Sequence, residues 1–282
     1  MFLKYWILWK ICYIYSIRCY YFTTITVFLI SQNFQKCRFS TSGRSDKCSD
    51  LILIDFEQGT VTDNPDISGT EYQETFPCFS ADNYTIYFCR APYIPQPDST
   101  RRMRYDLYSI SFNPQTGQLG DSIHEVFRAS SEGKSVSFPK CSPDGKYLLF
   151  SVSDYGTFPI WHPETDLWML ELSTGKIDKM EKTNGRYSDS YHSWNSNSQW
   201  IAFASKRDDR VYGRPYFAHV SQDGSVSKAF LPQENPETYL NTFKSYNIPE
   251  LYNTAETYDA HELQKAYFGK EAENLRYKSI KK

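Results

Sequence analysis

The segment Phe138-Pro139-Lys140-Cys141-Ser142-Pro143-Asp144-Gly145-Lys146-Tyr147-Leu148-Leu149-Phe150 occurs three times, in variant forms, along this chain of 282 residues. The earlier copy, residues 76–88, reads Phe-Pro-Cys-Phe-Ser-Ala-Asp-Asn-Tyr-Thr-Ile-Tyr-Phe. The later copy, residues 191–203, reads Tyr-His-Ser-Trp-Asn-Ser-Asn-Ser-Gln-Trp-Ile-Ala-Phe. Self-similarity at intervals of roughly 50 residues indicates a repeat architecture. It also favours a binding role over catalysis, because stacked repeats usually present binding surfaces.

Each copy predicts a β-hairpin. Ser-Pro-Asp-Gly at 142–145 and Ser-Ala-Asp-Asn at 80–83 are turn sequences, since Asp bonds its own backbone and Gly or Asn accepts a positive φ. The residues that follow, 86–88, 148–150 and 201–203, are β-branched, aromatic or aliphatic and fit strands.

A second segment follows each hairpin at a variable distance. Its copies begin at Asp106, Asp166 and Arg214, run through an apolar strand and end in a glycine turn; a further copy begins at Asp50 without a hairpin before it. A short fourth strand is expected after each turn. Four antiparallel strands per repeat predict the blade of a β-propeller, with blades at 76–127, 138–180 and 191–231 and a half blade at 50–62.

Ser-Pro-Asp-Gly-Lys-x-Leu-x-Phe at 142–150, followed by Asp-Leu-Trp at 166–168 and a Thr-Gly turn, resembles the PD40 (WD40-like) repeats of TolB-type β-propellers. The resemblance covers roughly 50–231 and weakens at 191–224, where Asn197-Ser198 replaces Asp-Gly. It implies an all-β propeller of about three and a half to four blades, fewer than the six usual in the family. It also implies a periplasmic or cell-envelope setting.

Residues 1–45 differ in composition from the repeats at 46–234. They contain no Asp or Glu, and residues 11–30 carry Arg18 as their only charge. That run is long enough to span a bilayer, so we expect either a membrane anchor or an upstream sequence joined to a truncated propeller gene. After the repeats, residues 235–282 predict a helical tail, most simply a solvated one.

In a blade of four antiparallel strands, the first and third connections lie at one end, and the second connection and the link to the next blade lie at the other. The connections therefore divide between two faces of the propeller. The hairpin and Thr-Gly turns share one face, and every long connection lies on the other, the loop face, where variable loops usually carry function. Candidate ligand- or partner-binding residues on the loop face are Arg101, Arg102, Arg104, Asp154, Trp161, His162, Arg186, His192, Arg207, Asp208 and Asp209. His192 begins an innermost strand and is expected at the mouth of the central funnel.

Structural alternatives exist for these candidates. His192 could be polar filling of a wet channel, and Arg101, Arg102 and Arg104 could be a solvated cluster. Asp208 and Asp209 could form local ion pairs with Arg207, which stabilise little at a surface. Trp161 and His162 form the best aromatic and polar pair for a sugar or peptide, although Trp161 could pack between blades.

Several functions are not expected. The net charge of −2 argues against nucleic-acid binding. The seven cysteines form no CxxC pair, so no metal site is expected, and no cofactor motif occurs. Without a G-x-S-x-G or H-E-x-x-H motif we expect no catalysis. The sequence therefore predicts a non-catalytic interaction or scaffold protein of the cell envelope that presents its loop face to a protein partner. The alternatives are a hydrolase- or peptidase-related propeller without its catalytic part and a sugar- or peptide-binding sensor.

Overall fold

A computed structural model gives the fold of the chain. The structure describes residues 71–94 and 101–251 except 232 and 247, together with 26–30, 51–55, 60–62, 67, 261, 264–265 and 276–278. The chain divides into two compact units. One contains residues 76–112 and 120–253, and the other contains 1–75, 113–119 and 254–282. Each unit is described by itself.

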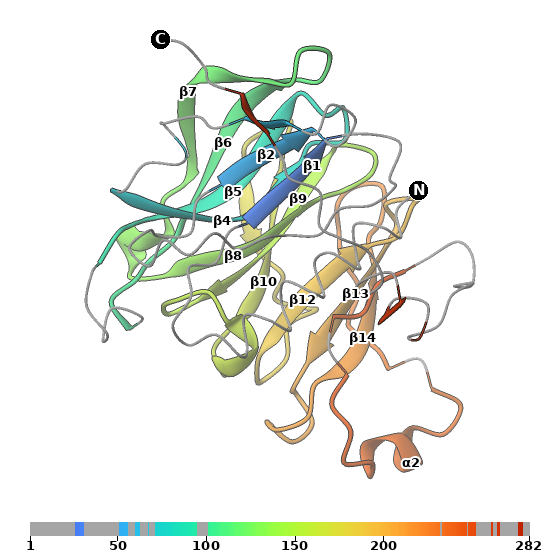
Figure 1. The fold of residues 1–282 in the computed structure, drawn as a ribbon. Coiled ribbons are helices and arrows are strands. Elements are labelled where there is room, and N and C mark those ends of the chain that lie inside the picture. Colours follow the sequence, from blue (N-terminus) through green and yellow to red (C-terminus); the bar gives the residue numbers. More distant parts are fainter. Residues whose placement is uncertain are drawn as a thin grey trace. The chain divides into compact units, whose positions relative to one another are not determined.

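Three antiparallel sheets follow one another along the chain (Figure 1). Each runs in sequence order. The first contains β4 (Tyr72–Phe79), β5 (Thr85–Pro92), β6 (Asp106–Asn113) and β7 (Gln118–Phe127). The second contains β8 (Ser135–Cys141), β9 (Tyr147–Ser153), β10 (Asp166–Glu171) and β11 (Ile177–Lys179). The third contains β12 (Asp189–Trp194), β13 (Trp200–Ser205) and β14 (Arg214–His219), and two isolated bridges, Phe217 to Phe230 and Val220 to Val226, mark its fourth edge. The prediction of repeated blades is confirmed.

The three hairpin tips share one hydrogen-bond pattern, as the repeated sequence predicts. In the second blade the Ser142 hydroxyl accepts from the Tyr147 amide at 3.0 Å and donates to Asp144 Oδ1 at 2.6 Å. Ser80 and Asp82 repeat these contacts in the first blade, and Asn195 Oδ1 accepts from the Trp200 amide in the third. The fourth tip residue always has positive φ: Asn83 (64°), Gly145 (73°) and Ser198 (62°).

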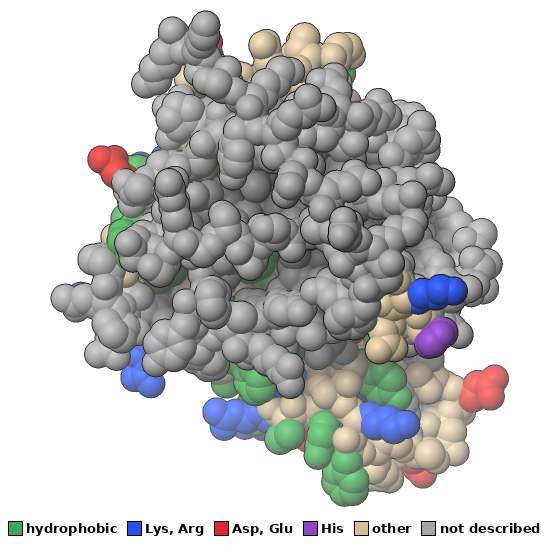
Figure 2. All heavy atoms as spheres, in the orientation of Figure 1, with side chains coloured by type: hydrophobic (Ala, Val, Ile, Leu, Met, Phe, Trp, Pro, Cys, Tyr) green, Lys and Arg blue, Asp and Glu red, His purple; other side chains and the backbone are tan. Residues whose placement is uncertain are grey.

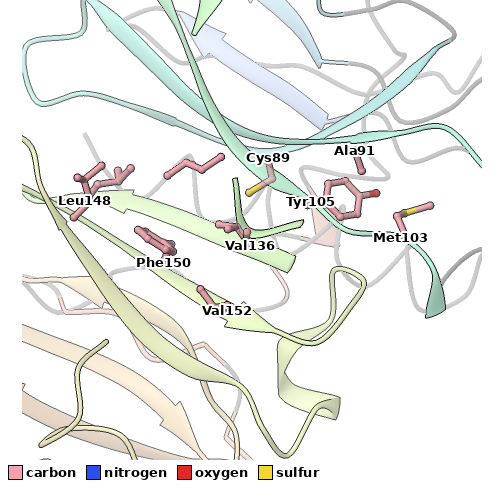
Figure 3. Packing of buried hydrophobic residues seen from close by; sticks show 11 residues of the cluster. Cys89, Ala91, Met103, Tyr105, Val136, Leu148, Phe150 and Val152 are labelled. Atoms are coloured by element: carbon pink, nitrogen blue, oxygen red, sulfur yellow. The ribbon is translucent and has the colours of Figure 1, made fainter. Parts of the chain in front are cut away.

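Neighbouring blades pack face to face, and β9 shows how. Successive side chains of a strand point to opposite faces. Leu148, Phe150 and Val152 therefore join a cluster with the first blade, whereas Leu149 joins a cluster with the third. Figure 3 shows side chains of the first cluster, among them Cys89, Ala91, Met103, Tyr105 and Val136, gathered between the sheets. Every residue of β9 is buried, because both of its faces are covered.

The innermost strands carry a second repeated feature, an aromatic residue in the left-handed region. Phe76, Phe138 and Tyr191 have φ near +50°, at 51°, 54° and 50°. In β8 and β12 these residues lie where the pairing register shifts, as in a β-bulge. Their rings form a row, with centroids 4.0 Å apart between Phe76 and Phe138 and 4.9 Å apart between Phe138 and Tyr191. The innermost strands of successive blades therefore meet side by side, as a propeller requires.

The other unit contains a four-stranded sheet with order β1-β2-β3-β15. The predicted half blade forms its antiparallel centre, β2 (Leu51–Asp55) and β3 (Thr60–Thr62). β1 (Thr26–Ile30) pairs with β2 in parallel, and β15 (Arg276–Lys278) pairs with β3 in parallel. Of the expected membrane segment 11–30, only β1 lies among the described residues. No helix in the described part of the chain is long and apolar enough to cross a membrane.

The segment after the third blade begins with a helix, as the sequence predicts, but later parts of it differ from the predicted helical tail. Helix α2 (Pro236–Leu240) lies at the start of the predicted helical tail, residues 235–282. Residues 242–246 and 248–249 then contact the third blade through hydrogen bonds: the Tyr246 amide donates to Gly213 O at 2.7 Å, and the Ser193 hydroxyl donates to Pro249 O at 2.8 Å. Residues 276–278 form β15 where a helix was expected, since pairing with β3 outweighs the weak helical pattern there.

Candidate functional site

The long connections of successive blades lie side by side on the loop face. The Gly156 amide, after β9, donates to Met103 O before β6 at 3.0 Å. The Ser188 hydroxyl, before β12, donates to Pro159 O at 2.9 Å, and the Lys206 amide donates to Ser188 O at 3.0 Å. The connections β9–β10, β11–β12 and β13–β14 are therefore joined by hydrogen bonds, and a site assembled from all three is held in one arrangement.

A buried arginine organises the β13–β14 connection. Arg214 is 1% exposed, and its Nη1 lies 2.7 Å from Asp209 Oδ2 and 3.5 Å from Asp208 Oδ2. Its Nη2 donates to Leu240 O at 2.8 Å. The equivalent residues of the other blades are Asp106 and Asp166, so the third blade reverses the charge of a repeat position. Sequence reasoning missed Arg214, although this departure from the repeat was a visible signal.

Asp209 connects Arg214 to the loop backbone, because one of its carboxylate oxygens pairs with Arg214 and the other accepts from two loop amides. Its Oδ1 accepts from the amides of Val211 at 2.9 Å and Tyr212 at 2.8 Å. Burial raises the pKa of the Asp209 carboxyl, but these amides and Arg214 outweigh it and hold the pKa below its usual value. Asp209 is therefore ionised at neutral pH and fixes the residues beside it, Arg210 (φ 67°) and Val211.

The three joined connections surround a pocket of about 310 Å³. Its walls combine aromatic, aliphatic and basic side chains, and no carboxylate lines it. The lining residues are Ile160, Trp161, Pro163, Tyr187, Ser188, Lys206, Arg210 and Val211. We call this cavity the loop-face pocket. Its volume is at the lower end of small-ligand sites, which are about 300–1,000 Å³.

The cations at the loop-face pocket stack on its aromatic rings. Lys206 Nζ lies 4.5 Å from the Trp161 ring centroid. The Cζ atoms of Arg186 and Arg210 lie 5.3 and 5.9 Å from the Tyr187 ring centroid. Desolvation lowers the pKa of Lys206, against an opposing effect of Asp209. Cation–π contact places these charges without using their N–H donors.

Two of the predicted site residues belong to this pocket or border it. Trp161 follows Ile160 at the end of the short 3₁₀ turn Pro159–Trp161 and is 75% exposed, so it does not pack between blades. Arg186 is exposed beside Tyr187. Tyr187, Lys206 and Arg210 were not predicted as site residues. The sequence does not show which loop charges pair with neighbouring carboxylates, nor that the Tyr187 ring contacts an arginine.

Other predicted residues have structural partners away from the pocket. The Arg104 guanidinium donates to Gly133 O at 2.9 Å and to Arg101 O at 2.8 Å, while Arg101 and Arg102 are exposed. Asp154 pairs with Lys134 at 2.6 Å. His162 is 9% exposed, with Nδ1 3.1 Å from Glu164 Oε1.

Arg207 holds two connections together and does not pair with its neighbours Asp208 and Asp209. Its Nη2 lies 2.8 Å from Asp189 Oδ1 and donates to Thr183 O at 2.9 Å. Asp189 is fully buried, and desolvation raises the pKa of its carboxyl in spite of Arg207. Asp208 accepts from the Tyr216 hydroxyl at 2.8 Å. The expectation of ion pairs between Arg207 and Asp208 or Asp209 is wrong, because both aspartates form ion pairs with Arg214 instead.

His192 also differs from expectation. It is 2% exposed, with Nε2 3.0 Å from Leu149 O, and burial lowers its pKa to about 3. The side chain is a neutral interblade group and does not face the mouth of a funnel. The prediction rested on the position of His192 at the start of an innermost strand, and the register shift between Ser190 and Ser193 changes the direction of the side chain there.

Among the described residues, no three His, Cys, Asp or Glu side chains are grouped so that they could hold a metal ion. The apolar walls and ring-held cations of the loop-face pocket suit an anionic group attached to an apolar one.

Comparisons with known proteins gave matches among solved structures only. Neither family models nor curated proteins match the chain. Among solved structures, the β-propeller domain of the Trilobed protease from Pyrococcus furiosus is 14% identical with a TM-score of 0.35, over 58% of this chain and 44% of that one. An oligogalacturonate lyase from Vibrio parahaemolyticus is 15% identical with a TM-score of 0.40, over 67% of this chain and 46% of that one. A puromycin-hydrolyzing peptidase from Mycobacterium tuberculosis is 15% identical with a TM-score of 0.39, over 58% and 23%.

This chain thus spans less than half the length of each of these structures. At such identities and TM-scores the likeness does not extend to activity. The propeller assignment follows from the repeated sheets and their packing.

Proposed function

We propose that this protein is a non-catalytic β-propeller that binds a protein partner through its loop face. The observation that carries the proposal is a set of exposed large apolar side chains on that face. Trp161 is 75% exposed, Val211 61%, Phe158 39% and Phe243 86%; we call these four residues the loop-face patch. Phe243 lies in the segment after α2, and its ring centroid is 6.1 Å from that of Tyr212.

The composition of this surface supports protein binding. Aromatic residues and arginine are enriched at protein interfaces, and exposed apolar patches mark interaction sites. Figure 2 shows hydrophobic and basic side chains beside one another in the lower part of the view, where Figure 1 draws α2. The resemblance of the repeats to TolB-type propellers supports, as part of the proposal, a partner in the periplasm or cell envelope.

Site-specific photo-crosslinking tests the proposal. A photoreactive amino acid at Val211 should capture one protein in cells, and the same group at Thr174, an exposed outer-turn residue, should not. With the captured partner purified, Trp161→Ala should weaken binding tenfold or more, as for aromatic hot spots. Thr174→Ala is the matched control. Equal capture at both positions, or full affinity in Trp161→Ala, would contradict a partner site on the loop face.

A small-ligand sensor is the second candidate, and the loop-face pocket is the observation that favours it. A ligand bound to the native state raises the melting temperature. A thermal-shift screen of peptides and sugars against the wild type and Trp161→Ala separates the two: a shift that is lost in the variant favours sensing, whereas capture of a protein at Val211 favours the interaction role.

A further inference from the structure

Three cations at the loop-face pocket lack the carboxylate partners that other loop-face cations have. Arg207 pairs with Asp189, Arg214 with Asp209, and Lys134 with Asp154. Among the described residues, no carboxylate lies within ion-pair distance of the side chains of Arg186, Lys206 or Arg210. Asp209, which acts electrostatically on Lys206, is already paired with Arg214. The described loops therefore offset the positive charge at the pocket only in part, through the effect of Asp209 on Lys206, and form no ion pair with these three cations.

The rings hold these cations in a geometry suited to an anion. A guanidinium stacked on a ring keeps its edge N–H donors available, and those donors match a carboxylate. Arg186 and Arg210 share the Tyr187 ring, while Lys206 lies over Trp161. Arg210 also adopts positive φ (67°), uncommon for a residue of its size, and hydrogen bonds hold it there: its own amide donates to Lys206 O, and Asp209 fixes the next residue.

The neutral part of the lining argues against a sugar. A sugar ring presents several hydroxyls that need matching polar groups. Apart from the two cations, the lining offers side-chain hydroxyls only from Tyr187 and Ser188, and the Ser188 hydroxyl already donates to Pro159 O. Ile160, Pro163 and Val211 are apolar. The complementary ligand carries a carboxylate beside an aliphatic or aromatic group.

We propose that the loop-face pocket binds an acidic peptide segment of the partner, with an Asp or Glu carboxylate between Lys206 and Arg210 and a neighbouring apolar side chain against Trp161 and Val211. This inference rests on the proposed function and specifies the partner's chemistry. Because the cations are partly exposed, binding should weaken as salt rises.

Titration with synthetic peptides tests the charge requirement. An acetylated, amidated peptide of alternating Glu and Leu should change the tryptophan fluorescence of the wild type but not that of Trp161→Phe, and it should bind at least tenfold more tightly than the same peptide with Gln for Glu. Trisaccharides of uronic acid form a second arm. Equal affinity for the Glu and Gln peptides overturns the proposal. A protein that binds the uronic acid trisaccharide but does not bind the Glu peptide overturns it as well.

The variant Lys206→Gln plus Arg210→Gln tests the residues. It should lose at least tenfold in affinity for the Glu peptide and most of the salt dependence, while Lys206→Arg retains binding. Lys176→Gln, which removes an exposed lysine paired with Asp178 at 2.7 Å, is the matched control and should bind as the wild type. Circular dichroism checks that each variant folds.

The partner identified by crosslinking separates this inference from the proposed function. Full affinity of the double variant for that partner overturns the acidic-peptide inference alone. Absence of any captured partner in the wild type overturns the proposed function, whatever the peptides do.

Discussion

His192 shows how one residue departs from its repeat. Proline occupies the equivalent position in the other two blades, at Pro77 and Pro139. The third blade has a buried imidazole whose Nε2 contacts Leu149 O. A sequence pattern identifies such a departure, but whether the ring faces solvent or a neighbouring blade depends on the local bulge. The residue was therefore identifiable and its environment was not.

The burial of His192 predicts a stability that falls in acid. Its folded pKa is about 3, below the ordinary value of 6.5. As pH falls from about 6.5 to about 3 the unfolded chain binds a proton that the folded one excludes, so the free energy of unfolding decreases, by roughly 1 kcal/mol per pH unit. Urea denaturation of the wild type and His192→Gln across this range measures the effect. The variant should show the shallower pH dependence, and parallel curves would contradict it.

The loops are the elements on which prediction succeeded least. The order of the strands placed the long connections on one face, and the sequence named Trp161 and Arg186, which line or border the loop-face pocket, because aromatic and basic residues in loops are conspicuous. Which charges remain without a counter-ion is set by tertiary pairing, as the partners of Arg207 and Arg214 show. Lys206 and Arg210 therefore stood out only once Asp189 and Asp209 were seen to be engaged elsewhere.

The β13–β14 connection should depend on Arg214. Arg214→Met leaves Asp208 and Asp209 without their cation and Leu240 O without its donor, so the free energy of unfolding should fall by at least about 2 kcal/mol. Arg214→Lys should recover little of the lost free energy of unfolding, because one ammonium group cannot replace the planar set of guanidinium donors. Chemical denaturation is the measurement, with Lys176→Met as the exposed control that should show no measurable change. A stable Arg214→Met would show that the buried ion pairs do not order this loop.

The hairpin tips are the elements that sequence predicted best, because their chemistry is local. Gly145 has a φ of 73°, and a Cβ placed there would meet only Ala81 Cβ at 3.4 Å. Gly145→Ala should therefore lower the free energy of unfolding by about 1 kcal/mol through backbone conformation alone. Asn83→Gly, at the equivalent position, should change it by less than about 0.5 kcal/mol. A loss several times larger in Gly145→Ala would indicate steric conflict between the tips.

For the whole molecule, repetition predicted the sheets and their order, since each blade is a local unit. Long-range pairing was not predictable from the repeats: β1 and β15 join β2 and β3 in parallel, and Tyr246 and Pro249 hydrogen-bond to the third blade. Neither feature has a counterpart in the repeat. The sequence had suggested either a membrane anchor or a joined upstream sequence at one end, and a solvated helical tail at the other.

Packing between blades should supply much of the stability of the propeller unit. Phe150 is fully buried in the cluster between the first two blades. Phe150→Ala should lower the free energy of unfolding by about 3–5 kcal/mol, from lost burial and the cavity left behind. Trp161→Ala, an aromatic truncation on the surface, should cost less than about 0.5 kcal/mol. Urea denaturation followed by near-ultraviolet circular dichroism compares them, and similar losses in both variants would contradict the interblade core.

The linked tips carry a practical consequence for attaching a probe. The Asp144 amide donates to the Ser198 hydroxyl at 2.9 Å, which joins the tip of the second blade to that of the third. An insertion at either tip would disturb both, whereas the turn at Thr174 and Gly175 lies at an outer edge with nothing within 4 Å of a Cβ built on the glycine. An epitope tag inserted there would attach the molecule to a surface with its loop face outward and the linked tips undisturbed.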